Sequence, residues 1–421
     1  MSIFKYREEI CVMIDKKSQK DVIVVGGGPA GMMLGLLLAK VGVQVIVLES
    51  HDNFDREYRG EVLQPRFIQL LNQLKLREYI EQLPHSKLKK GAFYHYDKKK
   101  GDFDFTSMIA EAPYALWIPQ PILLQALYKK AKEYPTFDMM FHAPVKKLLE
   151  KDGTVTGVVV DGENKELLEI QAKIVVGADG RFSTIRRLGG FELEYQHYPG
   201  DLIWFSVKRP SHWGEELRFK ITEGHSYITL PKYPNLLQVG IALPRGEWKE
   251  TQRQGIENFR QEIMHANKGF HEFAESLVDF KPFVPLQAKN HMVKTWAKNG
   301  CLLIGDAAHC SSPVGAIGVS LAVTTAAVAA DVIWDALQKC DVSAKVLCRV
   351  QEIRSEEIEE IHQIQERMGN LFFTSSKFVK GIRPYIVSAA FKTPLFSMIQ
   401  KKLFVMKNPI SINPAFIFNE E

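Results

Sequence analysis

A glycine-rich turn near the start of the chain has the residue types and spacing of a site for a dinucleotide pyrophosphate. Gly26, Gly28 and Gly31 form the pattern G-x-G-x-x-G, and Pro29 and Ala30 stand between its last two glycines. The first glycine permits a tight turn, the second lets the backbone approach a pyrophosphate, and the third lets a helix pack on a strand. The free N–H groups and the dipole at the start of that helix attract phosphate.

Glu49 supplies the acid that such a site needs. It follows the apolar run 44–48 (QVIVL), at the distance from the glycines where a carboxylate binds a ribose diol. An acid here favours the unphosphorylated adenosine ribose of NAD or FAD over that of NADP. Because strand, turn, helix, second strand and acid are all present, a glycine-rich turn without a ligand is the weaker interpretation.

Two later segments carry small and polar residues at the ends of apolar runs. The run 175–180 (VVGADG) ends in Asp179 and Gly180, and the run 302–309 (LLIGDAAH) contains Gly305 and Asp306. A turn and a helix start rich in small residues follow the second run, with Pro313, Gly315, Gly318 and Val319.

These residues need a particular set of elements to bring them together. Apolar runs predict a buried parallel strand at 21–26, a second strand at 44–48 that completes a βαβ unit, and another buried strand at 301–304. Two further strands are predicted at 154–160 and 173–176, around a turn at Gly162. Helical periodicity predicts helices at 29–41, 64–83, 121–133, 252–265, 317–337 and 351–367. Short alternating runs between residues 201 and 243, with an excursion at 89–106, predict an antiparallel sheet.

The composition is that of a globular protein with a large core. Hydrophobic residues make up 46% of the 421 residues and charged residues 24%, which argues against disorder and favours two domains. The net charge of +5 comes without a Lys/Arg-rich block, so we expect no nucleic-acid binding. The five cysteines form no C-x-x-C pair, which speaks against a disulfide reductase or a zinc ribbon. We therefore expect no metal site, and a reduced, cytoplasmic setting.

Together, the three motifs resemble the para-hydroxybenzoate hydroxylase-like, or UbiH-like, FAD-dependent monooxygenases, also called group A flavoprotein monooxygenases. The resemblance spans about residues 21–367, and the motifs come in the order that the family has. It implies an α/β fold with a Rossmann-type FAD-binding domain, an inserted, mainly antiparallel β-sheet substrate domain and a helical C-terminal segment. The bounds that we expect are 1–20 for a leader, 21–85, 113–195 and 285–367 for the FAD-binding domain, 86–112 and 196–284 for the substrate domain, and 368–421 for the tail.

The resemblance also implies roles for individual residues. Asp306 would bind the FAD ribityl chain, Asp179 and Gly180 would lie near the pyrophosphate, and the turn 313–318 would aim N–H groups at the flavin. Three more residues would contact FAD: Arg59 at the phosphates or flavin edge, Gln120 at the ribityl chain and Val145 at the adenine. Ser320 and Thr325 depart from the family, since many relatives have Asn and Asp there.

The activity that the resemblance implies is hydroxylation of an aromatic or other electron-rich small molecule through a flavin C4a-hydroperoxide. NADPH or NADH would dock transiently as reductant and O₂ would be the second substrate, so no protein dyad or triad is required. The substrate would lie between the flavin and the antiparallel sheet, with Trp204, Phe219, His225 and Tyr227 as candidate lining residues, although such strand residues are more often core.

Two other classes of protein stay open: a reductase of the geranylgeranyl reductase type, and an FAD-holding protein that binds a ligand without catalysis. The basic tail after Ser375 either packs on the FAD-binding domain with its lysines outward, which we favour, or contacts a membrane surface. We expect a monomer or a homodimer.

Overall fold

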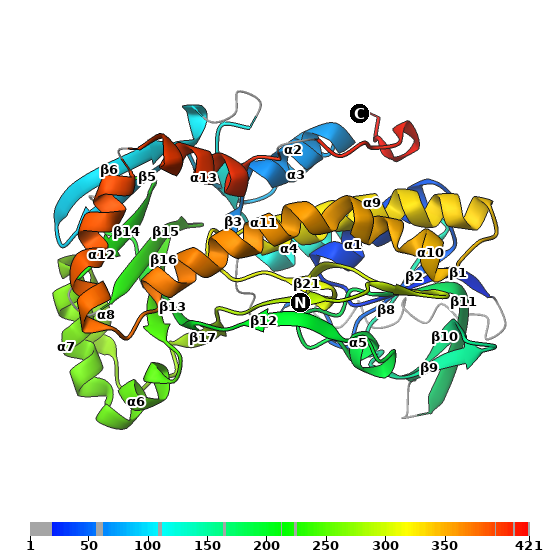
Figure 1. Ribbon diagram of the computed structural model, residues 1–421, viewed down its shortest axis with the longest axis horizontal. Coiled ribbons are helices and arrows are strands. Elements are labelled where there is room, and N and C mark those ends of the chain that lie inside the picture. Colours follow the sequence, from blue (N-terminus) through cyan, green and yellow to red (C-terminus); the bar gives the residue numbers. More distant parts are fainter. Residues whose placement is uncertain are drawn as a thin grey trace, which may run out of the picture.

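The computed structural model describes residues 19–55, 62–107, 112–162, 166–211, 213–222, 225–391, 393–406 and 409–419. Their fold is mixed α/β (Figure 1), which confirms the predicted fold class at that level. Residues 1–18 of the expected leader (1–20) and Arg59 lie outside the described residues. The predicted domain bounds stay a prediction.

A parallel sheet forms the first half of the molecule. Its strands run in the order β20-β11-β1-β2-β8, and the short β19 joins the edge beside β20 in antiparallel fashion. Their bounds are Cys301–Leu303 (β20), Leu167–Gly177 (β11), Lys20–Val25 (β1), Val45–Leu48 (β2), Phe137–Met140 (β8) and Ala297–Lys298 (β19). Short β-branched runs form the central strands because such side chains fit a sheet that is covered on both faces. The antiparallel strand β10 (Thr154–Asp161) pairs with the first half of β11 on one side and with β9 (Val145–Lys151) on the other.

Helices cover this sheet. Helix α1 (Pro29–Lys40) is apolar all round and packs against β2, α4 (Gln120–Ala131) and α9 (Gly318–Gln338). Helix α11 (Arg349–Phe372) runs alongside α9 and extends toward the other half of the molecule (Figure 1). The shorter helices of this half are α2 (Pro65–Leu74), α3 (Arg77–Glu81), α5 (Thr184–Leu188) and α10 (Ala344–Leu347). The βαβ unit predicted around the glycine-rich turn is thus present.

An antiparallel-rich sheet forms the second half, on the left of Figure 1. Its described strands run in the order β17-β13-β16-β15-β14-β5-β6. Their bounds are Val284–Gln287 (β17), Gly200–Lys208 (β13), Leu236–Pro244 (β16), Ser226–Lys232 (β15), Glu216–Ile221 (β14), Lys90–His95 (β5) and Lys98–Asp104 (β6). The only parallel pair among them is β14 with β5, which brings the excursion at 89–106 into the same sheet. One face of the sheet packs on α6 (Glu247–Gln254), α7 (Ile256–Ala266) and α8 (His271–Ser276).

Two small sheets connect the halves. One contains β12 (Leu193–His197), β18 (Asn290–Val293) and β21 (His309–Cys310), and the other contains β3 (Val62–Leu63), β7 (Ala115–Trp117) and β4 (Ser86–Leu88).

The C-terminal tail is helical, with α12 (Lys377–Ala390) and α13 (Pro394–Phe404). Val387 of α12 packs with Phe93 and Ile221 of the antiparallel-rich sheet, so α12 lies on that sheet rather than on the FAD-binding half that we expected. Leu403 and Phe404 of α13 join the main core. Apolar contacts of the tail therefore determine where it packs, and the charge pattern of the tail does not.

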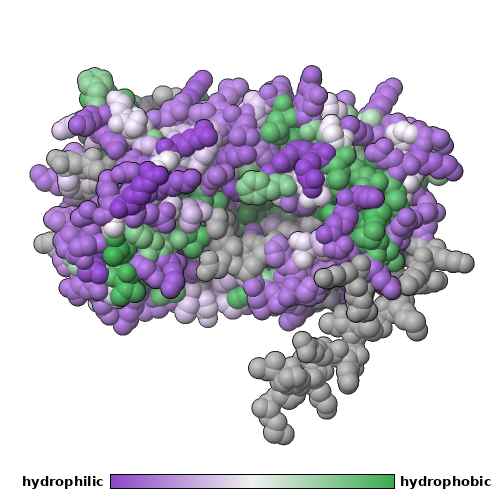
Figure 2. All heavy atoms as spheres, turned by 90° about the horizontal axis from the view of Figure 1, so that it is seen from below, coloured by the Kyte–Doolittle hydropathy of each residue, from purple (hydrophilic) through white to green (hydrophobic). Residues whose placement is uncertain are grey.

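Among the described helices, α9 alone is long and apolar enough to cross a membrane by length and composition. Within its most apolar stretch, 78% of the residues are buried inside the protein. A helix that is apolar all round is expected in a core, and α9 packs on α1 and α11. On the face shown in Figure 2, hydrophilic residues cover most of the surface and hydrophobic ones are seen in a hollow near the middle.

Candidate functional site

A large cavity lies between the parallel sheet and the antiparallel-rich sheet. Its volume is about 1210 Å³, larger than the roughly 300–1,000 Å³ typical of a site for one small ligand. Sixteen of the predicted site residues line it, from both halves of the chain. They are Gly26, Gly28, Pro29, Ala30, Glu49, Gln120, Val145, Asp179, Gly180, Trp204, Phe219, Asp306, Pro313, Gly315, Gly318 and Val319.

The three glycines of the first motif have different steric roles. Gly26 has a φ of +109°, and a Cβ there would lie 2.5 Å from the carbonyl oxygen of Ala178. A Cβ at Gly31 would lie 1.9 Å from the carbonyl oxygen of Gly26, so only glycine lets α1 pack this closely on the turn after β1. A Cβ at Gly28 would meet nothing within 4 Å, because Gly28 borders the cavity. The backbone at Gly28 therefore forms an open cradle at the N-terminus of α1, which is the shape and polarity that a pyrophosphate requires.

Glu49 lies at the end of β2, beside this cradle. Its Oε2 accepts a hydrogen bond of 2.8 Å from the N–H of Gly27, and its Oε1 lies 2.5 Å from Nδ1 of His51. The backbone N–H of His51 also donates to Oε1, at 3.0 Å. These contacts hold the carboxylate at the cavity wall, where it can bind a ribose diol.

Asp179 begins the turn after β11 and has a structural task. Its carboxylate accepts hydrogen bonds from Ser183 Oγ (2.5 Å) and from the N–H groups of Thr184 (2.6 Å) and Ile185 (3.1 Å), so it holds the start of the short helix α5. Burial raises the pKa of Asp179, and these hydrogen bonds oppose that effect. Gly180, with a φ of +79°, turns the chain beside the cavity and leaves open space where a Cβ would be.

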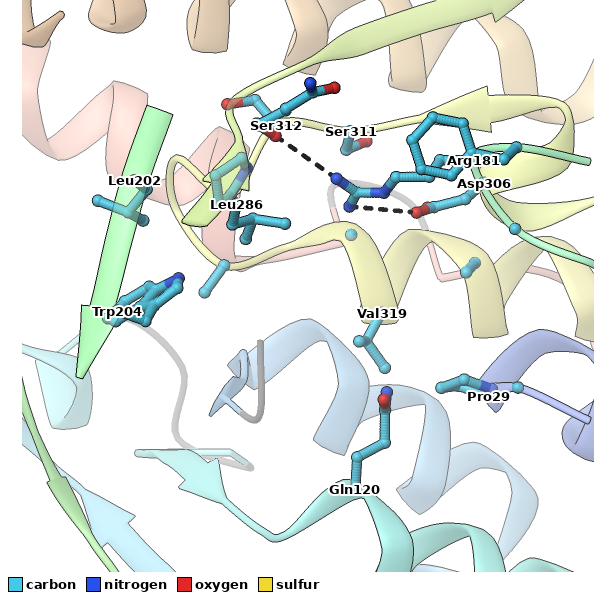
Figure 3. A pocket seen from close by; sticks show the side chains of 18 of the residues that line it. Pro29, Gln120, Arg181, Leu202, Trp204, Leu286, Asp306, Ser311, Ser312 and Val319 are labelled. Carbon is cyan, nitrogen blue, oxygen red and sulfur yellow. Dashed lines mark hydrogen bonds and ion pairs between the residues drawn. The ribbon is translucent and has the colours of Figure 1, made fainter. Parts of the chain in front are cut away.

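Asp306 faces Arg181 across one end of the cavity. Asp306 Oδ2 lies 3.6 Å from Arg181 Nη2, as the dashed line in Figure 3 shows. Burial raises the pKa of Asp306, and the charge of Arg181 opposes that effect. Gly305, just before it, has a φ of +58°, and a Cβ there would lie 3.2 Å from the Cβ of Ala30. Gly305 thus keeps the loop of Asp306 close to α1 but does not itself line the cavity.

The turn before α9 is held by two glutamines that the sequence did not single out. Gln365 of α11 accepts from the N–H of Ser312 at 3.2 Å and donates to the carbonyl oxygens of Ser312 and Val314 at 2.9 and 2.7 Å. Gln64 donates to the carbonyl oxygen of Gly315 at 2.7 Å. These bonds fix a turn whose φ at Gly315 is +82°, and they come from residues far away in the chain. Local sequence carries no signal for them.

The first turn of α9 presents Gly318, Val319 and Ala322 to the cavity. Figure 3 shows Gln120 pointing from α4 toward Val319. Ser320 and Thr325, where the family often has Asn and Asp, are fully buried and are not among the residues that line the cavity. This geometry therefore does not support a hydrogen bond from Ser320 to a ligand in this cavity.

The antiparallel-rich sheet forms the far wall of the cavity. Trp204 and Phe219 line it, as predicted, but His225 and Tyr227 do not. Neighbours on a strand point to opposite faces, and Ile228, next to Tyr227, takes the cavity side. His225 instead pairs with Glu247 and Glu262 under helices α6 and α7. The prediction that His225 and Tyr227 line the substrate space is thus corrected.

Comparisons with known proteins identify the class. A family model described as "FAD binding domain" matches residues 19–342, so the chain belongs to this family. The chain is 29% identical over 392 residues to 6-methylpretetramide 4-monooxygenase of Streptomyces rimosus, with 91% of each chain covered. It is 28% identical over 346 residues to digeranylgeranylglycerophospholipid reductase 1 of Methanococcoides burtonii, with 79% of this chain and 78% of that one covered.

Among solved structures, p-nitrophenol 4-monooxygenase from Pseudomonas putida has a similar fold. The TM-score is 0.77 at 20% identity, and the match covers 93% of this chain and 99% of that one. The protein is an FAD-dependent oxidoreductase, which confirms the resemblance to flavoprotein monooxygenases seen in the sequence.

Proposed function

We propose that the protein is a monooxygenase that consumes NADPH or NADH and hydroxylates an aromatic or other electron-rich small molecule. One observation carries this proposal: a single cavity runs from an open phosphate cradle at Gly28 to an apolar, aromatic wall at Trp204 and Phe219. Such a cavity has room for a dinucleotide and a second, apolar molecule in contact with it. The relative from Streptomyces rimosus is named as a monooxygenase, which supports the same activity.

The residues around the cavity fit FAD. The N–H groups at the start of α1 would hold the pyrophosphate, Glu49 the adenosine ribose, and Val145 would lie at the adenine. Asp306 and Gln120 would bind the ribityl chain, and the N-terminus of α9 would stabilise negative charge on the flavin pyrimidine edge. Bound FAD supplies the redox and oxygen chemistry that no side chain provides. No catalytic dyad is therefore required of the chain.

The protein's own contribution is to position the reactants and exclude water. Apolar side chains of the antiparallel-rich sheet desolvate the substrate. The hydrogen bonds from Gln64 and Gln365 keep the turn before α9 rigid. The overall reaction would be that substrate–H, O₂, NAD(P)H and H⁺ give substrate–OH, NAD(P)⁺ and H₂O. One oxygen atom enters the product and the other leaves as water.

A reductase is the second candidate, because the relative from Methanococcoides burtonii is named as one. A reductase would oxidise NAD(P)H and reduce its substrate without consuming O₂. Labelled ¹⁸O₂ separates the two activities, since only a monooxygenase places one label in the product.

The first measurement is the amount of FAD that is released when the purified protein is denatured. NADPH and NADH oxidation are then followed with a panel of phenols, quinolines and multi-ring polyketides, including 6-methylpretetramide. The proposal expects substrate-stimulated oxidation with either reductant and a product heavier by one ¹⁸O. A reduced product without label would refute the monooxygenase and support the reductase. A protein that takes up no FAD would refute both activities. The cytoplasmic location and the monomer or homodimer stay predictions.

A further inference from the structure

Gln238 is a polar side chain within an apolar part of the far wall of the cavity. The hydrophobic lining residues of this part are Val62, Phe103, Phe105, Leu202, Trp204, Leu217, Phe219, Ile228, Leu230 and Phe404. Other polar lining residues of the sheet, Asp201 and Gln287, lie where β13 pairs with β17. Gln238 lies on the inner strand β16 and is 7% exposed. A buried amide in such a setting needs partners for its oxygen and for its N–H groups.

The orientation of this amide is fixed by Trp117. The indole Nε1 of Trp117, itself 1% exposed, donates to Gln238 Oε1 at 3.1 Å. An indole N–H only donates, so the amide oxygen must face Trp117 and the amide nitrogen must point elsewhere. Among the described residues, Gln238 Nε2 has no protein acceptor, and the side chain borders the cavity.

The sheet register places Gln238 in the middle of the wall. Gln238 pairs with Leu230 on β15 and Ser206 on β13, and Gly240, two residues on, pairs with Trp204. Gln238, Leu230 and Trp204 therefore share the face toward the cavity. A Cβ at Gly240 would lie 2.8 Å from the indole ring of Trp204, so the glycine gives that ring its place beside Gln238.

We propose that Gln238 is a specificity-determining residue whose Nε2 donates a hydrogen bond to a carbonyl or phenolic oxygen of an aromatic substrate. This inference rests on the proposed function, because it takes the apolar end of the cavity as the substrate's place. The aromatic side chains of the wall bind the rings, and the amide selects molecules that carry an acceptor oxygen. A pure hydrocarbon chain leaves the buried N–H groups unpaired and is disfavoured.

Binding to the FAD-loaded protein tests this inference without turnover. The probes are 1-naphthol and naphthalene, which differ by one hydroxyl, and the readouts are the flavin absorbance change and calorimetry. The wild type is expected to bind 1-naphthol about tenfold more tightly than naphthalene, which corresponds to about 1.4 kcal/mol. A ratio near one, or no binding of either probe, overturns the proposal.

Two variants separate the amide nitrogen from the bond to Trp117. Trp117→Phe removes the indole donor but keeps Gln238, so the preference for 1-naphthol should persist. Adding Gln238→Leu removes both polar partners together and avoids an orphaned indole N–H. The double variant should bind naphthalene within about threefold of the single variant and lose the preference. A preference that survives in the double variant refutes the role of Gln238.

Thermal unfolding and FAD content are measured to check that both variants fold. The result is also distinguishable from that of the proposed function. A preference for 1-naphthol without ¹⁸O incorporation would refute the monooxygenase activity and leave the role of Gln238 standing. Incorporation of ¹⁸O without the preference would refute the role of Gln238 and leave the monooxygenase activity standing.

Discussion

Substituting Gly28 by serine should separate FAD binding from folding, which substitution of Gly26 or Gly31 does not allow because a Cβ there would clash with the backbone. Gly28 is the residue before α1, with φ of −75° and ψ of −177°, so a side chain is stereochemically permitted. A Cβ there meets nothing within 4 Å. Serine at this position can cap the helix by accepting a hydrogen bond from an N–H of its first turn.

The magnitudes follow from this geometry. For the FAD-free protein, the free energy of unfolding should stay equal or rise by a few tenths of a kcal/mol, because serine is a helix cap at least as good as glycine. For FAD binding, the new side chain fills the cradle and its hydroxyl occupies an N–H that a phosphate would use. Loss of one hydrogen bond to a charged group is worth roughly 1.5–3 kcal/mol, so the FAD Kd should rise by more than about tenfold.

The assay is urea unfolding of the FAD-free protein by circular dichroism, with FAD titrated into the folded protein by fluorescence quenching. Gly31→Ala is the matched comparison, since its Cβ would lie 1.9 Å from the carbonyl oxygen of Gly26. That variant should lose roughly 1–3 kcal/mol of stability or more through overpacking. If Gly28→Ser binds FAD as tightly as the wild type, the pyrophosphate does not lie at this turn and the assignment is refuted.

Three further predictions concern other parts of the molecule. Burial lowers the pKa of His225, but its hydrogen bonds with Glu247 and Glu262 outweigh this and raise the pKa to about 9. Because the pKa is higher in the folded state than in the unfolded state, protonated His225 should contribute up to about 3 kcal/mol of stability. This stability should be present below about pH 6.5 and lost as the pH rises through about 9. Urea midpoints across that window should fall more steeply for the wild type than for His225→Gln, and equal slopes would contradict this. Gln365→Leu should cost about 1–3 kcal/mol and weaken FAD binding by releasing the turn at 312–314, whereas Gln363→Leu on the exposed side of the same helix should change neither in the same unfolding and titration assays. Phe378 and Tyr385 on α12 are 75% and 70% exposed; if the tail only packs on the protein, the wild type and Phe378→Ser/Tyr385→Ser should both stay in the supernatant with anionic vesicles, and sedimentation of the wild type alone would establish a membrane contact.

The end of the cavity at the glycine-rich turn was predictable from the sequence because it is built from local patterns. The glycine spacing at residues 26–31 and the acid at Glu49 lie within one βαβ unit, and such a unit fixes its own geometry. The family resemblance, and not a local pattern, predicted that the Asp179 and Asp306 turns serve the same site. The helices and strands that carry these turns were predicted from hydrophobic periodicity, which is also a local property of the sequence.

The end of the cavity at the antiparallel-rich sheet was less predictable, because its residues come from strands that the fold brings together. Trp204 and Phe219 line the cavity and His225 and Tyr227 do not, which the sequence could not decide because assigning a face to a strand requires its register. Gln238 gave no signal, because a glutamine between leucine and valine looks like any other strand residue. Its meaning depends on Trp117, which lies 121 positions away in the chain and fixes the amide orientation.

The sequence itself thus determined the glycine-rich turn, the acid after the second strand and the two later Asp-containing turns. Short-range sterics and backbone dipoles are sufficient to specify a phosphate cradle. Tertiary structure alone decided which face of the antiparallel-rich sheet borders the cavity, where the tail packs, and that Asp179 is committed to holding α5. It also decided that one buried amide nitrogen is left to face the cavity. These features depend on long-range packing and strand register, which bring together side chains that no local pattern connects.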